Sequence, residues 1–258
     1  MAFKQSVWET NSYYEKAGNG SLDTNHPGIK LLVSLAKDKK EILDLGCGEG
    51  TRLSLISKKG TGVDISTKAI NFAKKKFSNL NFFMGNLEEL RFKDSSFDLV
   101  YSAYVFEHLT DPERVIGEAR RVLKIDGDLV IICPNYGSPN RASPPFKKSR
   151  INKLIAGFLK DFIYLFSKVD KLNWNRVTPI ATSRLYESDW DVTIEPYSLT
   201  LEKYLKTIGF KIVRNIQTWN YELGDAKFHQ RIFRFLGKNG IYPFSYWSPH
   251  IVIQARKI

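Results

Sequence analysis

Residues 41–50 read EILDLGCGEG, and this stretch decides the fold. An apolar run typical of a buried strand ends around Asp44, and glycine follows at positions 46, 48 and 50. Glycine adopts backbone angles that other residues avoid, and its lack of a side chain lets a ligand approach the main chain. We therefore predict a strand, a glycine turn that lies against a ligand, and a helix that begins after the turn.

Strand-like runs alternate with segments of helical periodicity from this turn to residue 135. The strand-like runs lie at 41–45, 61–65, 80–84, 97–102 and 128–133. This alternation predicts βαβ units around a parallel sheet, whose ligands collect at the carboxyl ends of the strands. Between the runs, Ser66 and the pair Asp111 and Pro112 are residues that commonly begin helices.

The alternation stops after Pro134. A loop-like segment precedes an amphipathic helix at about 147–169, and a helix at about 198–208 leads to strands at 210–216 and 250–255. An aromatic-rich segment separates the last two strands. We predict one domain over 1–258, with a cofactor-binding core at about 28–135 and substrate-capping insertions at about 136–195 and 218–249.

The composition fits one large globular unit, because 258 residues with 43% hydrophobic content can bury a substantial core. No apolar run is long enough to cross a bilayer and the first residues lack a signal-peptide pattern, so we expect a soluble cytoplasmic chain. Cys47 and Cys133 lack metal-binding or disulfide-framework spacing, and we expect no metal. The net charge of +12 favours anionic partners without choosing among them.

The ligand of the glycine turn is predicted to carry a nucleoside. Asp64 ends the second strand-like run 20 residues after Asp44, where a carboxylate can bind ribose hydroxyls. The glycine spacing is G-x-G-x-G, whereas nicotinamide dinucleotide binders use G-x-G-x-x-G. This spacing argues against a dehydrogenase.

Four segments in order, DLGCGEG, GVDIS, FFMGNLEELRF and FDLVYSAYVFEHL, resemble the class I S-adenosylmethionine-dependent methyltransferases. Within that class they are most similar to the small-molecule group of type 11, which includes quinone-biosynthesis enzymes. The resemblance implies an α/β, Rossmann-like seven-stranded sheet with the last strand antiparallel, to which the insertions add a helical and aromatic cap. It also implies S-adenosylmethionine as cofactor, S-adenosylhomocysteine as product, and in-line methyl transfer to a small apolar, aromatic or lipid-like acceptor.

The resemblance assigns twelve residues to the cofactor. These are Asp44, Gly46, Cys47, Gly48, Gly50, Asp64, Ile65, Asn86, Leu87, Tyr101, Ser102 and Ala103. The first four face the methionine part, with Asp44 reaching its amino group directly or through water, and the last three border the sulfonium and its methyl group. Asp64 takes the ribose.

Three of these residues are assigned to the adenine. Ile65 packs on the ring and the backbone N–H of Leu87 faces the ring edge. Asn86 stands where the family commonly has aspartate, and its amide oxygen can still accept a hydrogen bond from the adenine amino group.

His108 is the candidate general base if the acceptor must lose a proton, because it follows the fourth strand-like run and titrates near neutrality. The alternative is that Glu107 and His108 fix the loop or line the pocket. Tyr13 and Tyr14 form a lid over the cofactor or pack as part of an amphipathic arm.

The functional alternatives concern the acceptor and the insertions. The helix at 147–169 is a lid, which we favour, or a membrane-surface helix with basic flanks. The basic charge keeps a tRNA or rRNA methyltransferase open as the alternative, although no N-P-P-aromatic turn follows the fourth strand-like run and no RNA-binding module is recognisable. A catalytically silent cofactor-binding subunit is the other alternative.

Overall fold

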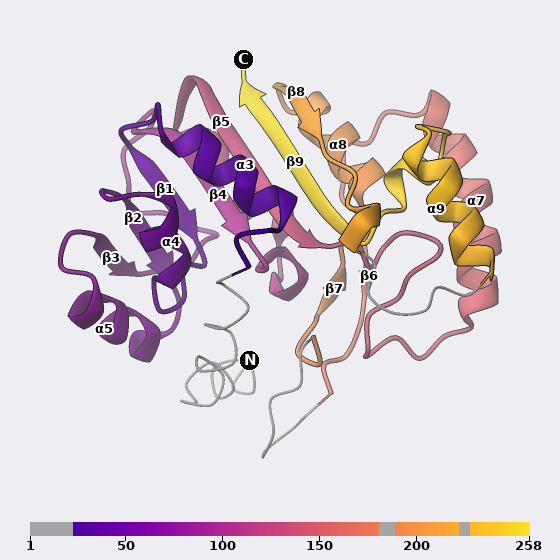
Figure 1. The fold of residues 1–258 in the computed structure, drawn as a ribbon, viewed down its shortest axis with the longest axis horizontal. Helices are drawn as coiled ribbons and strands as arrows, with labels where there is room; N and C mark the ends of the chain where they lie inside the picture. The colour runs from indigo at the N-terminus through magenta and orange to yellow at the C-terminus, as the bar shows by residue number, and fades with distance from the viewer. Residues whose placement is uncertain (1–22, 181–188, 222–227) are drawn as a thin grey trace.

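The computed structural model describes residues 23–180, 189–221 and 228–258. Seven strands form one sheet in the order β3-β2-β1-β4-β5-β9-β8 (Figure 1). The strands are β1 (Ile42–Leu45), β2 (Thr61–Asp64), β3 (Asn81–Met84), β4 (Phe97–Ala103), β5 (Leu123–Pro134), β8 (Phe210–Asn215) and β9 (His250–Lys257).

Pairing from β3 through β5 is parallel, and β9 is antiparallel to both of its neighbours, β5 and β8. The predicted seven-stranded sheet with an antiparallel last strand is therefore confirmed. The parallel strands all point their carboxyl ends at one edge, where the glycine turn follows β1.

Helices cover both faces of the sheet. The helices are α3 (Pro27–Ala36), α4 (Thr51–Ile56), α5 (Thr67–Lys76), α6 (Pro112–Val122) and α8 (Ser198–Thr207). Apolar residues of α3, α4 and α5 share one buried cluster, and those of α6 and α8 share another with the opposite sheet face.

Two of these helices begin at the residues that the sequence indicates. Ser66 Oγ accepts from the N–H of Ala69 (3.2 Å), and Asp111 Oδ1 accepts from the N–H of Arg114 (3.0 Å). Each bond satisfies one of the free N–H groups of a helix N-terminus.

Two long connections carry the remaining elements. Between β5 and α8 lie α7 (Arg150–Phe166), β6 (Asn175–Arg176) and β7 (Ile194–Glu195). Between β8 and β9 lie η2 (Trp219–Tyr221), α9 (Phe228–Lys238) and η3 (Phe244–Tyr246). The sequence analysis did not predict α9, although its apolar residues recur at helical spacing.

The two connections meet in an aromatic cluster outside the sheet core. Trp219 and Trp247 are buried there, and Phe158 of α7 and Phe233 of α9 pack against them. Asp161 of α7 accepts hydrogen bonds from Tyr197 Oη (2.7 Å) and Trp247 Nε1 (2.8 Å). Figure 1 shows α7 and α9 side by side at the end of the molecule farthest from β3 and α5.

Within the three described ranges, no helix combines the length and the apolar character needed to cross a membrane. Tyr13 and Tyr14, for which a lid was predicted, lie outside the described residues.

Candidate functional site

The glycine turn after β1 has a left-handed backbone at three positions, with φ of 80° at Gly46, 52° at Gly48 and 83° at Gly50. A Cβ atom at Gly46 would lie 2.4 Å from the Val105 side chain, and one at Gly50 would lie 2.6 Å from Phe82. At these two positions the backbone angle requires glycine, as the sequence analysis expected, and packing within the protein requires it as well.

Asp64 orders this turn. Its Oδ2 accepts from the N–H of Gly48 (2.9 Å), which ties the end of β2 to the turn, and its Oδ1 accepts from the N–H of Ser66 (2.9 Å). Burial raises the pKa of Asp64 despite these bonds. The carboxylate is thus fixed beside the turn, and each oxygen keeps acceptor capacity for a further donor.

Asp44 is fully buried at the same place. Its Oδ2 accepts from Tyr101 Oη (2.7 Å), whereas its Oδ1 has no hydrogen-bond partner among the described residues. Burial raises the pKa of Asp44 to about 7, and the nearby carboxylates of Asp64 and Glu49 add to the effect. A buried carboxylate oxygen without a donor is rare in a folded protein and indicates a place for a ligand donor.

Two charged residues at this turn, Glu49 and Arg52, were not singled out from the sequence. Arg52, in the first turn of α4, donates from Nη1 to the carbonyl oxygen of Ala103 (3.0 Å) and opposes the rise in the Asp44 pKa. Glu49 is buried, and its Oε1 has no hydrogen-bond partner in the described ranges. The available signal was their position, since Glu49 lies between Gly48 and Gly50 and Arg52 lies two residues after Gly50.

Ile65 and Asn86, which the sequence analysis assigned to the adenine, lie just after β2 and β3. Ile65 follows Asp64 and is 46% exposed, so its apolar side chain is open to a planar ring. Asn86 is exposed and its Oδ1 accepts from the N–H of Glu88 (3.0 Å). One lone pair of that oxygen therefore shapes the loop, and the second is available to a ligand.

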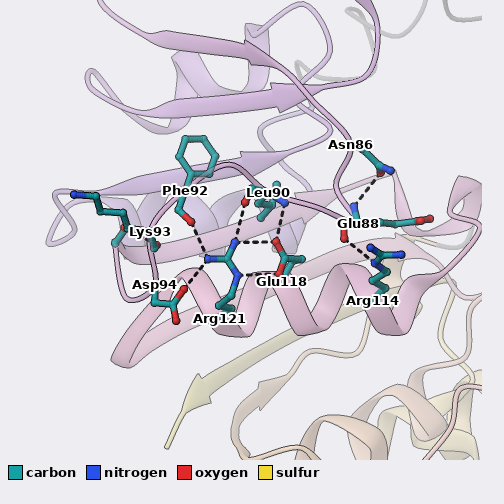
Figure 2. A network of polar contacts seen from close by, with 10 residues as sticks. Asn86, Glu88, Leu90, Phe92, Lys93, Asp94, Arg114, Glu118 and Arg121 are labelled. Carbon is teal, nitrogen blue, oxygen red and sulfur yellow. Dashed lines mark hydrogen bonds and ion pairs between the residues drawn. The ribbon is translucent and has the colours of Figure 1, made fainter.

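The loop that carries Asn86 is held by α6, as Figure 2 shows. Arg121 donates to the carbonyl oxygens of Leu90 and Phe92 (2.8 Å each), to Asp94 and twice to Glu118. Glu118 in turn accepts from the N–H of Leu90 (2.7 Å). All five N–H donors of the guanidinium are used, which fixes the loop in one conformation.

The remaining predicted cofactor residues have buried side chains. Ser102 Oγ donates to the carbonyl oxygen of Leu45 (3.1 Å), and Ala103 and Leu87 lie in the apolar core. Cys47 is a buried free thiol whose pKa is raised well above its usual value, chiefly by burial. These residues therefore support the turn and the strand ends, and only their backbone atoms are placed to meet a ligand.

His108 lies in η1 (Phe106–His108), where the core meets the first insertion. Its Nδ1 lies 3.3 Å from the carbonyl oxygen of Asp191 and 3.5 Å from Asp191 Oδ2, and its Nε2 lies 3.8 Å from Glu107 Oε1. Burial disfavours the charged imidazole, but Asp191 and Glu107 outweigh it and raise the pKa of His108. Burial also raises the pKa of Glu107 to about 7.

A pair of histidines near the site was not singled out from the sequence. His26 Nε2 and His250 Nδ1 lie 3.3 Å apart, and the ring of Tyr104 lies edge-on to both. Burial lowers the pKa of His26 to about 4 and that of His250 to about 3, so both are neutral at pH 7. The Arg52 guanidinium lies 5.4 Å from the centre of the Tyr104 ring, which joins this pair to the Asp44 site.

A cavity of about 320 Å³ lies beside the N-terminus of α7. The residues that line it include Phe146, Lys153 and Glu195, and none of them belongs to the glycine turn. Lys153 Nζ and Glu195 Oε2 form an ion pair at 2.8 Å. Within the described ranges, the cavity included, no group of three or more His, Cys, Asp or Glu side chains is arranged to hold a metal ion.

The geometry fits a cationic nucleoside. An amino group supplies the donor that Asp44 Oδ1 lacks, Asp64 accepts from a sugar, and Ile65 offers an apolar surface to a base. Three carboxylates around one turn favour a ligand with positive charge. The site residues thus fit S-adenosylmethionine, whose sulfonium and amino groups are both cationic.

The comparisons with known proteins agree with this geometry. Residues 43–131 match the family model described as a methyltransferase domain. The chain is 32% identical over 140 residues to a demethylmenaquinone methyltransferase of Thermotoga maritima. This match covers 52% of the chain and 57% of the relative. It is 33% identical over 120 residues to a probable S-adenosylmethionine-dependent methyltransferase of Mycobacterium tuberculosis, with 44% of each chain covered. The chain spans about half the length of these curated relatives.

A solved structure has the same fold. The crystal structure of a putative S-adenosylmethionine-dependent methyltransferase from Listeria monocytogenes superposes with a TM-score of 0.57 at 14% identity. The match covers 91% of this chain and 98% of that chain.

Proposed function

Because residues 43–131 form a methyltransferase domain of the class I, S-adenosylmethionine-dependent family, we propose that the chain methylates a small apolar, aromatic or lipid-like acceptor. The observation that carries the proposal is the buried Asp44 Oδ1, which has no hydrogen-bond partner among the described residues and stands beside the glycine turn. The acceptor class is supported by the aromatic cluster of the two insertions and by a relative named for demethylmenaquinone methylation.

When bound, S-adenosylmethionine supplies a methyl group on positively charged sulfur, which is already activated toward a nucleophile. Asp44 accepts from the amino group, and Tyr101 holds the Asp44 carboxylate in place. Asp64 accepts from the ribose hydroxyls, and Ile65 packs on the adenine. The task of these residues is to orient the reacting groups and exclude water, which accounts for much of the rate enhancement in such transfers.

His108 accepts the proton that the acceptor loses. With Nδ1 directed at the Asp191 carbonyl oxygen, Nε2 is the atom that takes the proton. The bound cofactor would supply the methyl group and keep the electron pair of its sulfur–methyl bond, and His108 would take the proton that the acceptor loses. Asp191 and Glu107 stabilise the imidazolium that results.

The test is a fractionation of methyl label. The protein is incubated with methyl-labelled S-adenosylmethionine and cell extract, and label is counted in the organic-soluble, low-mass aqueous and RNA fractions. We expect label in the organic-soluble fraction, unchanged by ribonuclease and absent with Asp44→Asn. Label in RNA that ribonuclease removes would instead establish the RNA methyltransferase alternative, and label in no fraction would indicate a silent cofactor-binding subunit.

The role of His108 is tested once an acceptor is identified. His108→Gln is expected to lower kcat by roughly 100-fold and to leave the dissociation constant for S-adenosylhomocysteine unchanged. Asp191→Asn is expected to shift the pH profile of kcat to lower pH, because the carboxylate helps to raise the His108 pKa. If Asp191→Asn does not change the pH profile of kcat, His108 has a structural role only.

A further inference from the structure

We propose that the outward sides of α7 and α9 form a docking surface for an anionic lipid membrane. We call this the outer surface and define it by ten exposed apolar residues. These are Ile151, Ile155, Leu159, Phe162, Ile163, Leu165 and Phe166 of α7, and Phe228, Ile232 and Phe235 of α9. The proposal goes beyond methyl transfer and does not depend on it.

The packing of the two helices explains why these residues are exposed. On α7 the apolar positions extend around most of the helix, and Leu154 and Phe158 pack on the aromatic cluster. On α9, Phe233 makes the corresponding contact, 5.2 Å from the Trp247 ring centre. Since each helix turns one side to this cluster, the other apolar residues are exposed, and Phe162 lies at the margin, where its ring contacts Phe158 and Tyr242.

The outer surface concentrates exposed apolar residues. Ten of the nineteen large apolar side chains found exposed in the described ranges lie on these two helices. Phe166 is 93% exposed, Phe228 is 79% exposed and Ile151 is 70% exposed. Single exposed apolar residues are ordinary, but such a concentration on two helices that pack on the same aromatic cluster indicates an interaction site.

The charge beside the outer surface is positive. The cationic residues on or next to the helices are Lys147, Lys148, Arg150, Lys153, Lys160, Lys168, Lys171, Arg231, Arg234 and Lys238, and one acidic residue, Asp170, lies between two of them. The only acidic residue within α7 or α9 is Asp161, which is buried and hydrogen-bonded to Tyr197 and Trp247. Exposed aromatic and aliphatic residues beside lysine and arginine are the pattern of helices that lie in the interface of an anionic bilayer.

This charge also argues for lipid over a second copy of the chain. Two outer surfaces in contact would bring the cations of one copy against those of the other without opposing carboxylates from either helix. An anionic headgroup layer instead pairs with the cations, while the acyl region accepts the apolar side chains.

The experiment is vesicle flotation with the whole chain and no cofactor. We expect binding to vesicles of equal parts phosphatidylcholine and phosphatidylglycerol, weaker binding as salt rises, and much weaker binding to phosphatidylcholine alone. The triple variant Phe166→Ser/Phe228→Ser/Phe235→Ser is expected to weaken binding by about tenfold or more for each residue. Its matched control, Phe72→Ser/Ile125→Ser/Ile258→Ser, replaces exposed residues elsewhere and is expected to bind as the wild type does.

A second pair of variants tests the charge. Lys168→Glu/Lys238→Glu is expected to weaken binding by at least about fivefold for each residue, whereas Lys74→Glu/Lys75→Glu on α5 changes the net charge equally and has little effect. All variants should bind S-adenosylhomocysteine as the wild type does, which shows that they are folded and separates this test from that of the methyl transfer.

Three results would overturn the proposal. These are no binding to either vesicle, equal losses in the outer-surface and control variants, and concentration-dependent self-association that the triple variant abolishes. The last result would assign the outer surface to a second copy of this chain.

Discussion

The substitution Asp44→Asn is expected to weaken cofactor binding while leaving the unliganded protein at least as stable. Asparagine has the same shape as aspartate and can still accept from Tyr101 Oη. It removes the negative charge and puts an amide NH2 in place of the free acceptor at Oδ1, and burying that unpaired NH2 costs about 1–3 kcal/mol, less than burying the charge. The variant should therefore lose cofactor affinity without losing stability. If the role of Asp44 were purely structural, the two would fall together.

The magnitude follows from the burial of Asp44. The pKa of Asp44 is raised from 3.8 to about 7, and each pKa unit corresponds to about 1.4 kcal/mol, so burial disfavours the ionised form by roughly 4 kcal/mol. Because the pKa is raised by folding, the stability that Asp44 contributes is lost as pH rises from about 4 through 7. The Asn variant lacks this loss, so its melting temperature should equal or exceed that of the wild type at pH 8.

The expected change in binding free energy is of similar size. Loss of one partner from a buried, hydrogen-bonded charge pair costs about 2–5 kcal/mol, which corresponds to roughly 30- to 5,000-fold in Kd for S-adenosylhomocysteine. Wild-type affinity should also fall about tenfold per pH unit below pH 7, because the ligand amino group binds the ionised carboxylate. In the variant this dependence should vanish.

Isothermal titration calorimetry with S-adenosylhomocysteine at several pH values measures both effects, and thermal denaturation measures stability. Asp128→Asn is the matched control, since Asp128 is equally buried but is paired with Lys39 (3.0 Å) and Arg256 (3.1 Å). The control should lose stability and keep its affinity. An Asp44→Asn protein that binds within threefold of wild type, or that loses stability as the control does, would refute the reasoning.

Three further predictions concern other parts of the site. Ile65→Ser should weaken S-adenosylhomocysteine binding about tenfold in calorimetry without changing the melting temperature, because the side chain is exposed until an adenine covers it; an unchanged affinity would remove Ile65 from the cofactor site. Arg121→Lys should lower the melting temperature by several degrees, since lysine cannot replace the five hydrogen bonds to the loop after β3, and Arg91→Lys is the control. Glu107→Gln should gain stability relative to wild type in denaturant titrations as pH rises from about 5 to 8, because folding raises the Glu107 pKa to about 7; a constant difference across that range would contradict it.

The local patterns of the sequence were sufficient for the parallel strands of the sheet and for the prediction that the glycine turn lies beside Asp44 and Asp64. The glycine turn, Asp44 and Asp64 lie within 21 residues of one another, and strand and helix periods are properties of short windows. The antiparallel last strand came from the family resemblance.

The contacts that give the site its chemistry join residues far apart in the sequence. His108 contacts Asp191, which is 83 residues away in the sequence, and His26 contacts His250, which is 224 residues away. No periodic pattern encodes such a pair, because it depends on how the insertions fold back onto the core.

The sequence by itself determined that a strand, a glycine turn, a helix and a second strand ending in an acid would follow one another, because backbone angles and hydrophobic periods are set by neighbouring residues. Only the tertiary structure decided that Gly46 makes room for Val105, that Asp44 keeps an oxygen without a donor, and that α7 turns Ile151 and Phe166 to the outside. An apolar pattern indicates that one face of a helix must be shielded from water. The tertiary packing decides which part of that face other residues of the same chain bury.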